Sequence, residues 1–267
     1  MDKISTKRSK ILSFLLSILT PGLGHLYNGK FIWAAAIPAI FYIVYCIIYY
    51  SSLIKSFTFF LIFVLLFIYV YIFSIVHSIV IAKRNSNYQL KRYNRVYIYL
   101  LWPILYFGIG SLLPANNSVM PLKIPTNNME NTLKAGDMIL ADMDYYQSNE
   151  VKRNDIVIFS SPKSPHELWI KRAIAFSGEK ISIENGKIFI NGKEYKEDNS
   201  NIIYENNNSD DIHDTVIPED HIFVIGDNRT NSLDSRNFGS IHERTVKGKP
   251  LYIYFSDSFD RIGIHLQ

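Results

Sequence analysis

Three long apolar runs near the start of the chain constrain its fold more than any other feature. They cover residues 31–50, 57–82 and 96–113, and the shortest holds 18 residues. An α-helix rises about 1.5 Å per residue, so runs of this length reach across the roughly 30 Å hydrocarbon core of a bilayer. Aromatic residues gather at the ends of the runs, where helices leave the membrane. The sequence therefore predicts a membrane region of three transmembrane helices over residues 31–113.

Basic residues predict the orientation of these helices. Residues 1–10 hold four Lys or Arg residues, and residues 83–95 hold five. Segments rich in Lys and Arg remain in the cytoplasm, and the two spans between them agree with both lying there. The third span then carries residues 114–267 to the outer side. We expect a multi-pass protein of the cytoplasmic (inner) membrane with an extracytoplasmic C-terminal domain.

The first 30 residues are expected to form a cytoplasmic N-terminal region with its own short helix. A brief apolar run at 11–19 stops at Pro21 and Gly22, so it is too short to span. We expect residues 10–27 to form an interfacial or re-entrant helix. Residues 21–30, PGLGHLYNGK, resemble a motif of small multi-span membrane modules. His77, in the second long run, is expected to pack between helices rather than to relay protons.

The composition excludes several kinds of ligand. The net charge of +4 is small and no basic stripe is interleaved with aromatics, so nucleic acid is not an expected partner. The single cysteine, Cys46, permits neither an internal disulfide nor a cysteine-based metal site. No histidine after residue 114 has a paired spacing with carboxylates, and no phosphate-binding loop is present. We expect no metal and no cofactor.

The C-terminal domain reads as mainly strand. Short β-branched or aromatic runs bounded by turn residues lie at 138–142, 154–161, 168–176, 180–184, 187–192, 221–227 and 250–255. The pair Asn185-Gly186 predicts a type I′ hairpin turn. The Asn-rich residues 196–215 are expected to form a surface insertion or flexible loop. The predicted fold is an α-helical membrane region of three spans followed by a mainly-β, partly barrel-like domain.

Four sequence blocks in this domain stand out together: IPTNNMENTLKAGD (124–137), RNDIVIF (153–159), WIKRAIAFSGEKI (169–181) and GDNRTNSLDSRNFG (226–239). In this order, downstream of a predicted span, they resemble the type I signal peptidases, the S26 serine proteases of the membrane. The resemblance covers roughly residues 115–260, and the last block is the most specific. The N-terminal spans are not part of the family core. The resemblance implies a signal-peptidase-type β domain that needs no cofactor.

Members of that family use a serine nucleophile and a lysine general base. A lysine acts as a base only when it is neutral, so it must lie where apolar surroundings depress its pKa. The resemblance makes Lys171 the base, and the apolar residues around it fit that role. It also implies that Ser232 hydrogen-bonds and orients this lysine. Four further residues would form an ion-paired brace beneath the site, since alternating Asp and Arg suit bidentate pairing: Asp227, Arg229, Asp234 and Arg236.

The first block departs from the family pattern at the nucleophile. Members read approximately Pro-Ser-Gly-Ser-Met-x-Pro-Thr-Leu, and the second serine attacks the peptide bond. Here Asn128 occupies that position, and a carboxamide is a very weak nucleophile. Thr126 falls where a hydroxyl helps to bind the oxyanion, and the backbone N–H of residue 128 can complete that hole. Thr126 or Thr132 as a substitute nucleophile would need a rearranged loop, because position i+2 of an extended chain lies nearly 7 Å away.

The departure is selective, because Lys171 and the last block remain intact. This pattern indicates that the blocks serve the fold or that a groove for extended peptides is still in use. In the family the peptide lies as an added strand with small side chains in shallow pockets. We expect Met129, Ile139 and Leu140 to line that groove.

Three functions are compatible with these residues. We favour a membrane-anchored homologue that binds the signal peptides of exported preproteins at the outer face and is catalytically impaired by Asn128. The alternative is an active signal peptidase that cleaves after small residues with an atypical nucleophile. A third is an outer β domain that only anchors partners. The partners expected are signal peptides, the lipid bilayer, and either an active paralogue or the export machinery.

Overall fold

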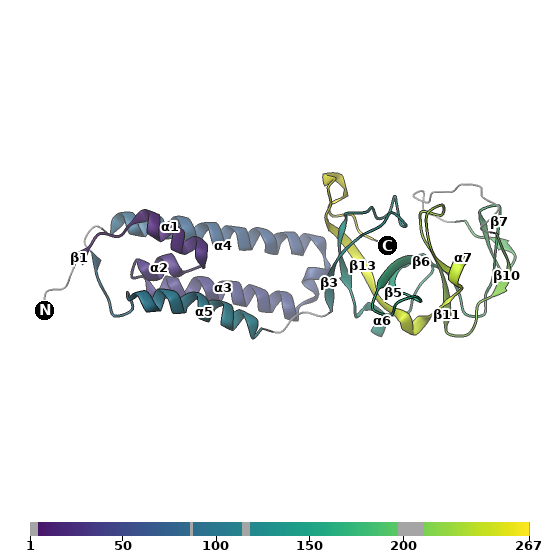
Figure 1. The fold of residues 1–267 in the computed structure, drawn as a ribbon, viewed down its shortest axis with the longest axis horizontal. Helices are drawn as coiled ribbons and strands as arrows, with labels where there is room; N and C mark the ends of the chain where they lie inside the picture. The colour runs from purple at the N-terminus through teal and green to yellow at the C-terminus, as the bar shows by residue number, and fades with distance from the viewer. Residues whose placement is uncertain (1–4, 86–87, 114–117, 197–210, 267) are drawn as a thin grey trace. The chain divides into compact units, whose positions relative to one another are not determined.

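The computed structural model describes residues 5–85, 88–113, 118–196 and 211–266 (Figure 1). The chain divides into two compact units, Met1–Ala115 and Asn116–Gln267. We call the first the helical unit and the second the β unit, and each is described by itself.

The helical unit contains five α-helices in its described part. They are α1 (Lys10–Leu19), α2 (Leu23–Tyr27), α3 (Phe31–Tyr50), α4 (Phe57–Arg84) and α5 (Val96–Ser111). A 3-10 turn, η1 (Ser52–Lys55), joins α3 to α4. Two short strands, β1 (Ser5–Thr6) and β2 (Tyr88–Gln89), pair antiparallel and tie the N-terminus to the segment after α4.

Two of the three predicted spans are helices long and apolar enough to cross a membrane. These are α3 with 20 residues and α4 with 28. The third predicted span, 96–113, also begins as a helix, but α5 ends at Ser111 after 16 residues. At about 1.5 Å per residue it is about 24 Å long, shorter than the hydrocarbon core. The described helices therefore include two span candidates where the sequence predicted three.

The predicted interfacial or re-entrant segment, 10–27, is broken into two helices. Its first helix, α1, buries polar rather than apolar residues: Ser13 and Ser17 are buried, while its large apolar side chains, apart from the half-buried Leu16, are exposed. Ser17 bonds to Ser78 of α4, with the two hydroxyl oxygens 2.7 Å apart. Every residue of α2 is buried. A polar inner face and an apolar outer face are typical of helices that pack together in lipid.

The β unit is built on a seven-stranded sheet with the order β12-β11-β6-β5-β13-β4-β3. Its strands are β3 (Val119–Lys123), β4 (Met138–Asp142), β5 (Ile156–Ser160), β6 (Leu168–Phe176), β11 (His221–Ile225), β12 (Ile241–His242) and β13 (Val246–Phe255). A second sheet, with the order β10-β7-β8-β9, contains β7 (Lys180–Glu184), β8 (Lys187–Ile190), β9 (Lys193–Glu194) and β10 (Ile212–Val216). Short helices α6 (Tyr145–Ser148) and α7 (Ser235–Phe238) connect strands.

The strand runs read from the sequence correspond to β4, β5, β6, β7, β8, β11 and β13. The type I′ turn is confirmed, because Asn185 and Gly186 have φ of 52° and 77° between β7 and β8. The expectation of a loop over residues 196–215 is wrong at the C-terminal end of that segment. Residues 212–216 form β10, which pairs with β7, whereas 196–215 was expected to be loop. The part of that segment from 197 to 210 lies outside the described residues.

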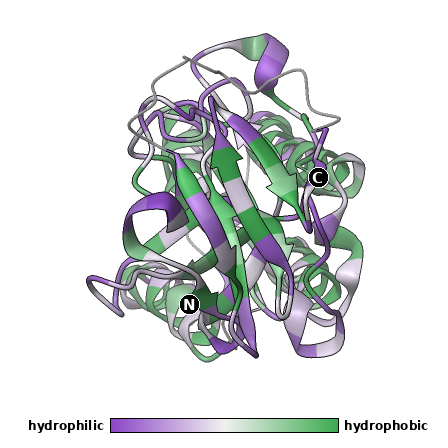
Figure 2. Ribbon diagram, turned by 90° about the vertical axis from the view of Figure 1, so that its right-hand side faces the viewer, coloured by the Kyte–Doolittle hydropathy of each residue, from purple (hydrophilic) through white to green (hydrophobic). Residues whose placement is uncertain are grey.

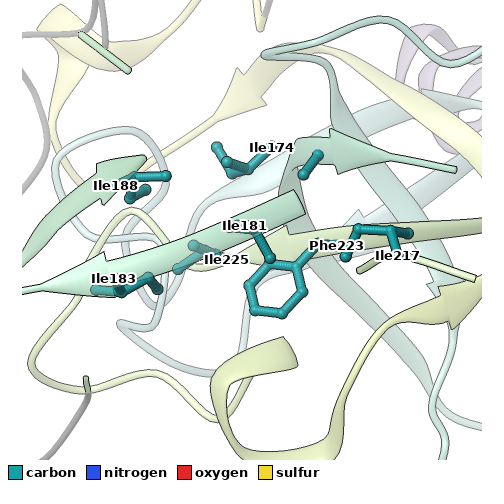
Figure 3. Packing of buried hydrophobic residues seen from close by; sticks show 8 residues of the cluster. Ile174, Ile181, Ile183, Ile188, Ile217, Phe223 and Ile225 are labelled. Carbon is teal, nitrogen blue, oxygen red and sulfur yellow. The ribbon is translucent and has the colours of Figure 1, made fainter. Parts of the chain in front are cut away.

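Buried aliphatic side chains hold the β unit together. One cluster joins β6 and β11 to the second sheet through Ile174, Ile181, Ile183, Ile188, Ile217, Phe223 and Ile225 (Figure 3). A second cluster places Met129 and Leu133 against Ile139 and Ile253. Burying one such side chain contributes about 1.5–3 kcal/mol. Figure 2 shows that strands of the β unit mix hydrophobic and hydrophilic residues, whereas the helices are predominantly hydrophobic.

Candidate functional site

The loop between β3 and β4 presents Asn128 in a fixed conformation. The backbone of Ile124 closes the loop, since its N–H donates to Asp137 and its carbonyl accepts from Gly136, each at 2.8 Å. The buried side chains of Met129 and Leu133 anchor the turn in the core. These are backbone and core interactions, so the loop keeps its path whatever side chain residue 128 carries.

A second chain segment holds Asn128 from the other side. The N–H of Asn228 donates to the Asn128 carbonyl oxygen at 3.2 Å, and its side-chain amide donates to the Asn127 carbonyl at 3.0 Å. The side chain of Asn127 turns away and accepts from the Ala135 N–H at 2.8 Å. The Asn128 side chain is half-buried and makes no hydrogen bond with any residue that the structure describes. Its carboxamide is therefore available to a ligand.

Lys171 lies on β6, an interior strand of the seven-stranded sheet, and is 1% exposed. On one side it pairs with Val157 of β5. On the other side, Ile225 of β11 pairs with Arg172. The strands are antiparallel, so the next residue, Gly226, lies opposite Lys171. Residues paired across antiparallel strands point to the same face of the sheet.

Gly226 shows what lies on that face. A Cβ atom at this position would meet Ser232 Oγ at 2.1 Å and the Asn128 carbonyl oxygen at 2.6 Å. The face toward which Lys171 points therefore contains both Ser232 and Asn128; the roles of base and nucleophile position stay predictions. These close contacts also explain why residue 226 is glycine, because a side chain there would overlap them. Gly226 was missed as a site residue, although its place at the head of the last block was a signal.

The pKa of the Lys171 ammonium is lowered from 10.5 to about 8, chiefly by burial, and Arg236 acts in the same direction. The carboxylates of Asp234 and Asp227 act in the opposite direction without cancelling that effect. Lys171 has no hydrogen bond or ion pair with a residue in the described ranges. A substantial fraction of this lysine is thus neutral near pH 8, which is the state that accepts a proton.

The hydrogen bond expected from Ser232 to Lys171 is not formed. The Ser232 hydroxyl is buried beside the Asp234 carboxylate, without hydrogen-bond geometry to it or to another described group. Its role in orienting the lysine stays a prediction.

Two of the four predicted brace residues, Asp234 and Arg236, form an ion pair with each other, whereas Asp227 takes a partner outside the predicted set. Asp227 forms a bidentate pair with Arg172 of β6, with Nε–Oδ1 and Nη2–Oδ2 distances of 2.8 and 2.7 Å. Thr132 also donates its hydroxyl proton to Asp227 at 2.5 Å. Both Arg172 and Thr132 were missed as brace residues. Arg172 directly follows Lys171 in the sequence, which was the available signal.

Asp234 pairs with its neighbour Arg236, at 2.9 Å between Oδ1 and Nε, and also accepts from the Gly226 N–H at 3.0 Å. Burial opposes ionisation of Asp234, but the hydrogen bonds from Arg236 outweigh it and hold the pKa of this carboxyl below its usual value. Arg229 donates to the Gly226 carbonyl at 2.9 Å. These bonds fix both backbone groups of Gly226, and so support the strand end beside Lys171.

A groove of about 410 Å³ opens beside Asn128. Its lining is mostly apolar and comes from two stretches and a single loop residue: 122–126 with Asn128, Met129 and Leu133, then 167–170, and Leu233. Met129, which was expected to line the groove, does so, and Thr126, which was expected at the oxyanion hole, is also in the lining. Ile139 and Leu140 do not, because both are buried inside β4 between β13 and β3.

The groove runs along two strand edges. Within the described sheets β3 is an end strand that pairs only with β4, and residues 168–170 of β6 pair with β5 alone. Exposed strand edges bind extended peptides through main-chain hydrogen bonds. In the described part of the chain, no three His, Cys, Asp or Glu residues converge on a position for a metal ion.

Known proteins are similar to this chain over its C-terminal part. Residues 97–255, more than half of the chain, match the family described as signal peptidase, peptidase S26. Thylakoidal processing peptidase 1, chloroplastic, of Arabidopsis thaliana is 30% identical over 148 residues, which are 52% of this chain and 42% of that protein. Signal peptidase IB of Staphylococcus aureus is 29% identical over 160 residues, 55% of this chain and 80% of that one.

The chain thus spans less than half the length of the thylakoidal relative and most of the staphylococcal one. Among solved structures, the crystal structure of a signal peptidase I from Enterococcus faecalis V583 has 30% sequence identity and a TM-score of 0.32. The matched region covers 38% of this chain and 97% of the chain in that crystal structure.

Proposed function

Because the chain belongs to the S26 signal peptidase family, we propose that its β unit binds signal peptides at the outer face of the cytoplasmic membrane and is catalytically impaired. The observation that carries this proposal is the position of Asn128. Its backbone is held against Asn228, its side chain lines an apolar groove, and it lies on the face toward which Lys171 points.

The chemistry at Asn128 argues for binding without turnover. Peptide cleavage by the serine–lysine route begins when the base removes a proton from a hydroxyl, which then attacks the carbonyl carbon. A carboxamide has no proton that a neutral lysine removes at ordinary pH, so no attacking oxyanion forms. It does offer an N–H₂ donor and a carbonyl acceptor, and both suit hydrogen bonding to a peptide main chain.

The groove supports binding of an extended segment. A peptide added along residues 122–125 and 168–170 would find strand edges on both sides. The apolar lining suits the small and apolar residues that precede a signal-peptide cleavage site. Two charged side chains, Lys123 and Glu167, lie in the lining and can set the direction of the bound strand. We extend the proposal to a role beside an active paralogue or the export machinery, which would take over the bound preprotein.

One observation favours the alternative of an active enzyme. Lys171 keeps the burial and the lowered pKa of a general base, although no hydroxyl stands at position 128. Activity would then need a hydroxyl from elsewhere, and Thr126 is the candidate because it lines the groove. Thr126 lies two residues from position 128, so the active enzyme is the second candidate function.

The full chain in detergent, mixed with a fluorescent signal peptide that has an Ala-x-Ala site, distinguishes the two. We expect saturable binding by fluorescence anisotropy and an intact peptide by mass spectrometry after prolonged incubation. Stoichiometric release of the mature product by the unaltered chain would establish the active enzyme instead. Absence of saturable binding would remove the peptide-receptor proposal.

A further inference from the structure

Arg8 of the helical unit is buried in a site made by two tyrosine rings. Its side chain is 7% exposed, and Cζ lies 4.4 Å from the ring centroids of both Tyr27 and Tyr88. Hydrogen bonds fix the rings, since the Tyr27 hydroxyl accepts from the Ser9 N–H at 3.1 Å and the Tyr88 hydroxyl donates to Asn94 at 2.7 Å. The guanidinium is thus held in place.

One edge of this guanidinium lacks an acceptor. Nε and Nη2 of Arg8 are buried and have no hydrogen-bond partner among the residues that the structure describes. The tyrosine faces attract the positive charge, but the N–H bonds lie in the guanidinium plane and need an oxygen. A buried donor left unsatisfied destabilises the fold, and a charged donor does so more strongly.

The described part of the helical unit offers no anion to that edge. Residues 1–115 contain eleven Lys or Arg residues and a single carboxylate, Asp2, which lies outside the described residues. Apart from Lys55, the described basic residues flank the end of the unit where α1, α3 and α5 begin and α4 ends. An anion from another molecule can therefore supply the acceptor that no described residue provides.

We propose that Arg8 binds the phosphate oxyanion of an anionic phospholipid headgroup. Nε and Nη2 form the edge through which Arg172 holds Asp227 in the β unit, so two parallel N–H···O bonds to a phosphate follow the same geometry. The surrounding cations add long-range attraction to an anionic membrane surface. A lipid has an advantage over a free phosphate ion, because its chains can pack against the exposed apolar side chains of α1, such as Ile11 and Leu15.

Native mass spectrometry of the full chain in neutral detergent tests this site with three probes: phosphatidylglycerol, phosphatidylcholine and inorganic phosphate. We expect phosphatidylglycerol to bind at least about tenfold more tightly than phosphatidylcholine. Arg8→Gln should weaken phosphatidylglycerol binding about tenfold. The matched control, Arg84→Gln, removes an exposed charge at the same end and should change binding by less than about twofold.

Arg8→Lys separates charge from geometry if the glutamine variant fails to fold. Lysine keeps the charge but lacks the planar fork, so most of the affinity should still be lost. Three results would overturn the proposal: equal losses in the Arg8 and Arg84 variants, full affinity in Arg8→Lys, or equal binding of the two lipids. Displacement of phosphatidylglycerol by inorganic phosphate at equal concentration would identify a site for the free ion and overturn the assignment to lipid.

Discussion

The hydroxyl of Thr132 donates a hydrogen bond to the carboxylate of Asp227 at 2.5 Å, and 95 residues of sequence separate the two. Because Asp227 is also held by Arg172, this contact joins the Asn128 loop, the strand of Lys171 and the last sequence block in one network. The shape of the groove depends on this network of hydrogen bonds.

Thr132→Val should loosen the Asn128 loop. Valine has nearly the same shape but leaves Asp227 with one donor fewer, so we expect the free energy of unfolding to fall by about 1.5–3 kcal/mol. Chemical denaturation of the full chain measures this loss. Thr126→Val is the control, because Thr126 is exposed, and it should cost less than about 0.5 kcal/mol. Equal losses in the two variants would contradict the network.

Lys171→Met should stabilise the protein at neutral pH. The pKa of Lys171 is about 8 in the folded state and 10.5 when unperturbed. Below pH 8 both states carry the proton, and the folded state bears the cost of a buried ammonium. As the pH rises from about 8 to 10.5, the folded state loses its proton first and that cost fades.

We therefore expect a gain in unfolding free energy of roughly 2–3 kcal/mol at pH 7, shrinking toward pH 10. Denaturation at both pH values measures it. Lys180→Met, at an exposed lysine of β7, serves as the control and should show no such pH dependence. A Lys171→Met gain that is absent at pH 7, or constant with pH, would show that Lys171 is not a strained buried base.

Gly226→Ala should disrupt the site. The new methyl group would overlap Ser232 Oγ and the Asn128 carbonyl, so either the loop or the strand end must move. Overpacking of this kind costs about 1–3 kcal/mol, and peptide affinity should fall with it. Gly108→Ala, in open space on α5, is the control and should neither lower thermal stability nor weaken peptide binding. Wild-type peptide binding by Gly226→Ala would show that this convergence does not shape the groove.

Leu233→Glu should weaken peptide binding specifically. Leu233 lines the groove, and a carboxylate there would be desolvated against apolar peptide side chains, so we expect about a tenfold loss of affinity by anisotropy. Phe259→Glu makes the same kind of change at a 90% exposed residue outside the groove lining and should have no effect. If both variants bind the peptide as the unaltered chain does, the groove is not its binding site.

Local patterns in the sequence predicted most strands of the β unit, because alternation and turn residues act over a few positions. The strand β3 was missed since it contains Pro121, which usually argues against a strand. Proline is tolerated there because β3 is an end strand of the described sheet. Ile139 and Leu140 were misplaced for another reason: β4 is buried on both faces, so alternation could not say which residues face the groove.

The sequence blocks predicted which residues belong to the candidate site. They did not predict hydrogen-bond partners that lie far apart in the sequence. Lys171, Asn128 and Ser232 were identified by block position alone, and the structure brings them to one face. The partner of Asp227 could not be read from the last block. It is Arg172 on another strand, and pairing between residues 55 positions apart depends on the fold. The helical unit shows the same limit, because composition does not set the residue at which α5 ends.

Asn128→Ser gives the most direct test of the central claim, that the site is complete except for its nucleophile. The purified full chain carrying this single change is incubated with a preprotein that has an Ala-x-Ala site, and cleavage is followed by gel and mass spectrometry. We predict that cleavage appears, increases as the pH is raised toward the Lys171 pKa of about 8, and disappears when Lys171→Met is added. A folded Asn128→Ser protein that binds the peptide but never cuts it, or that cuts it without Lys171, would contradict the account.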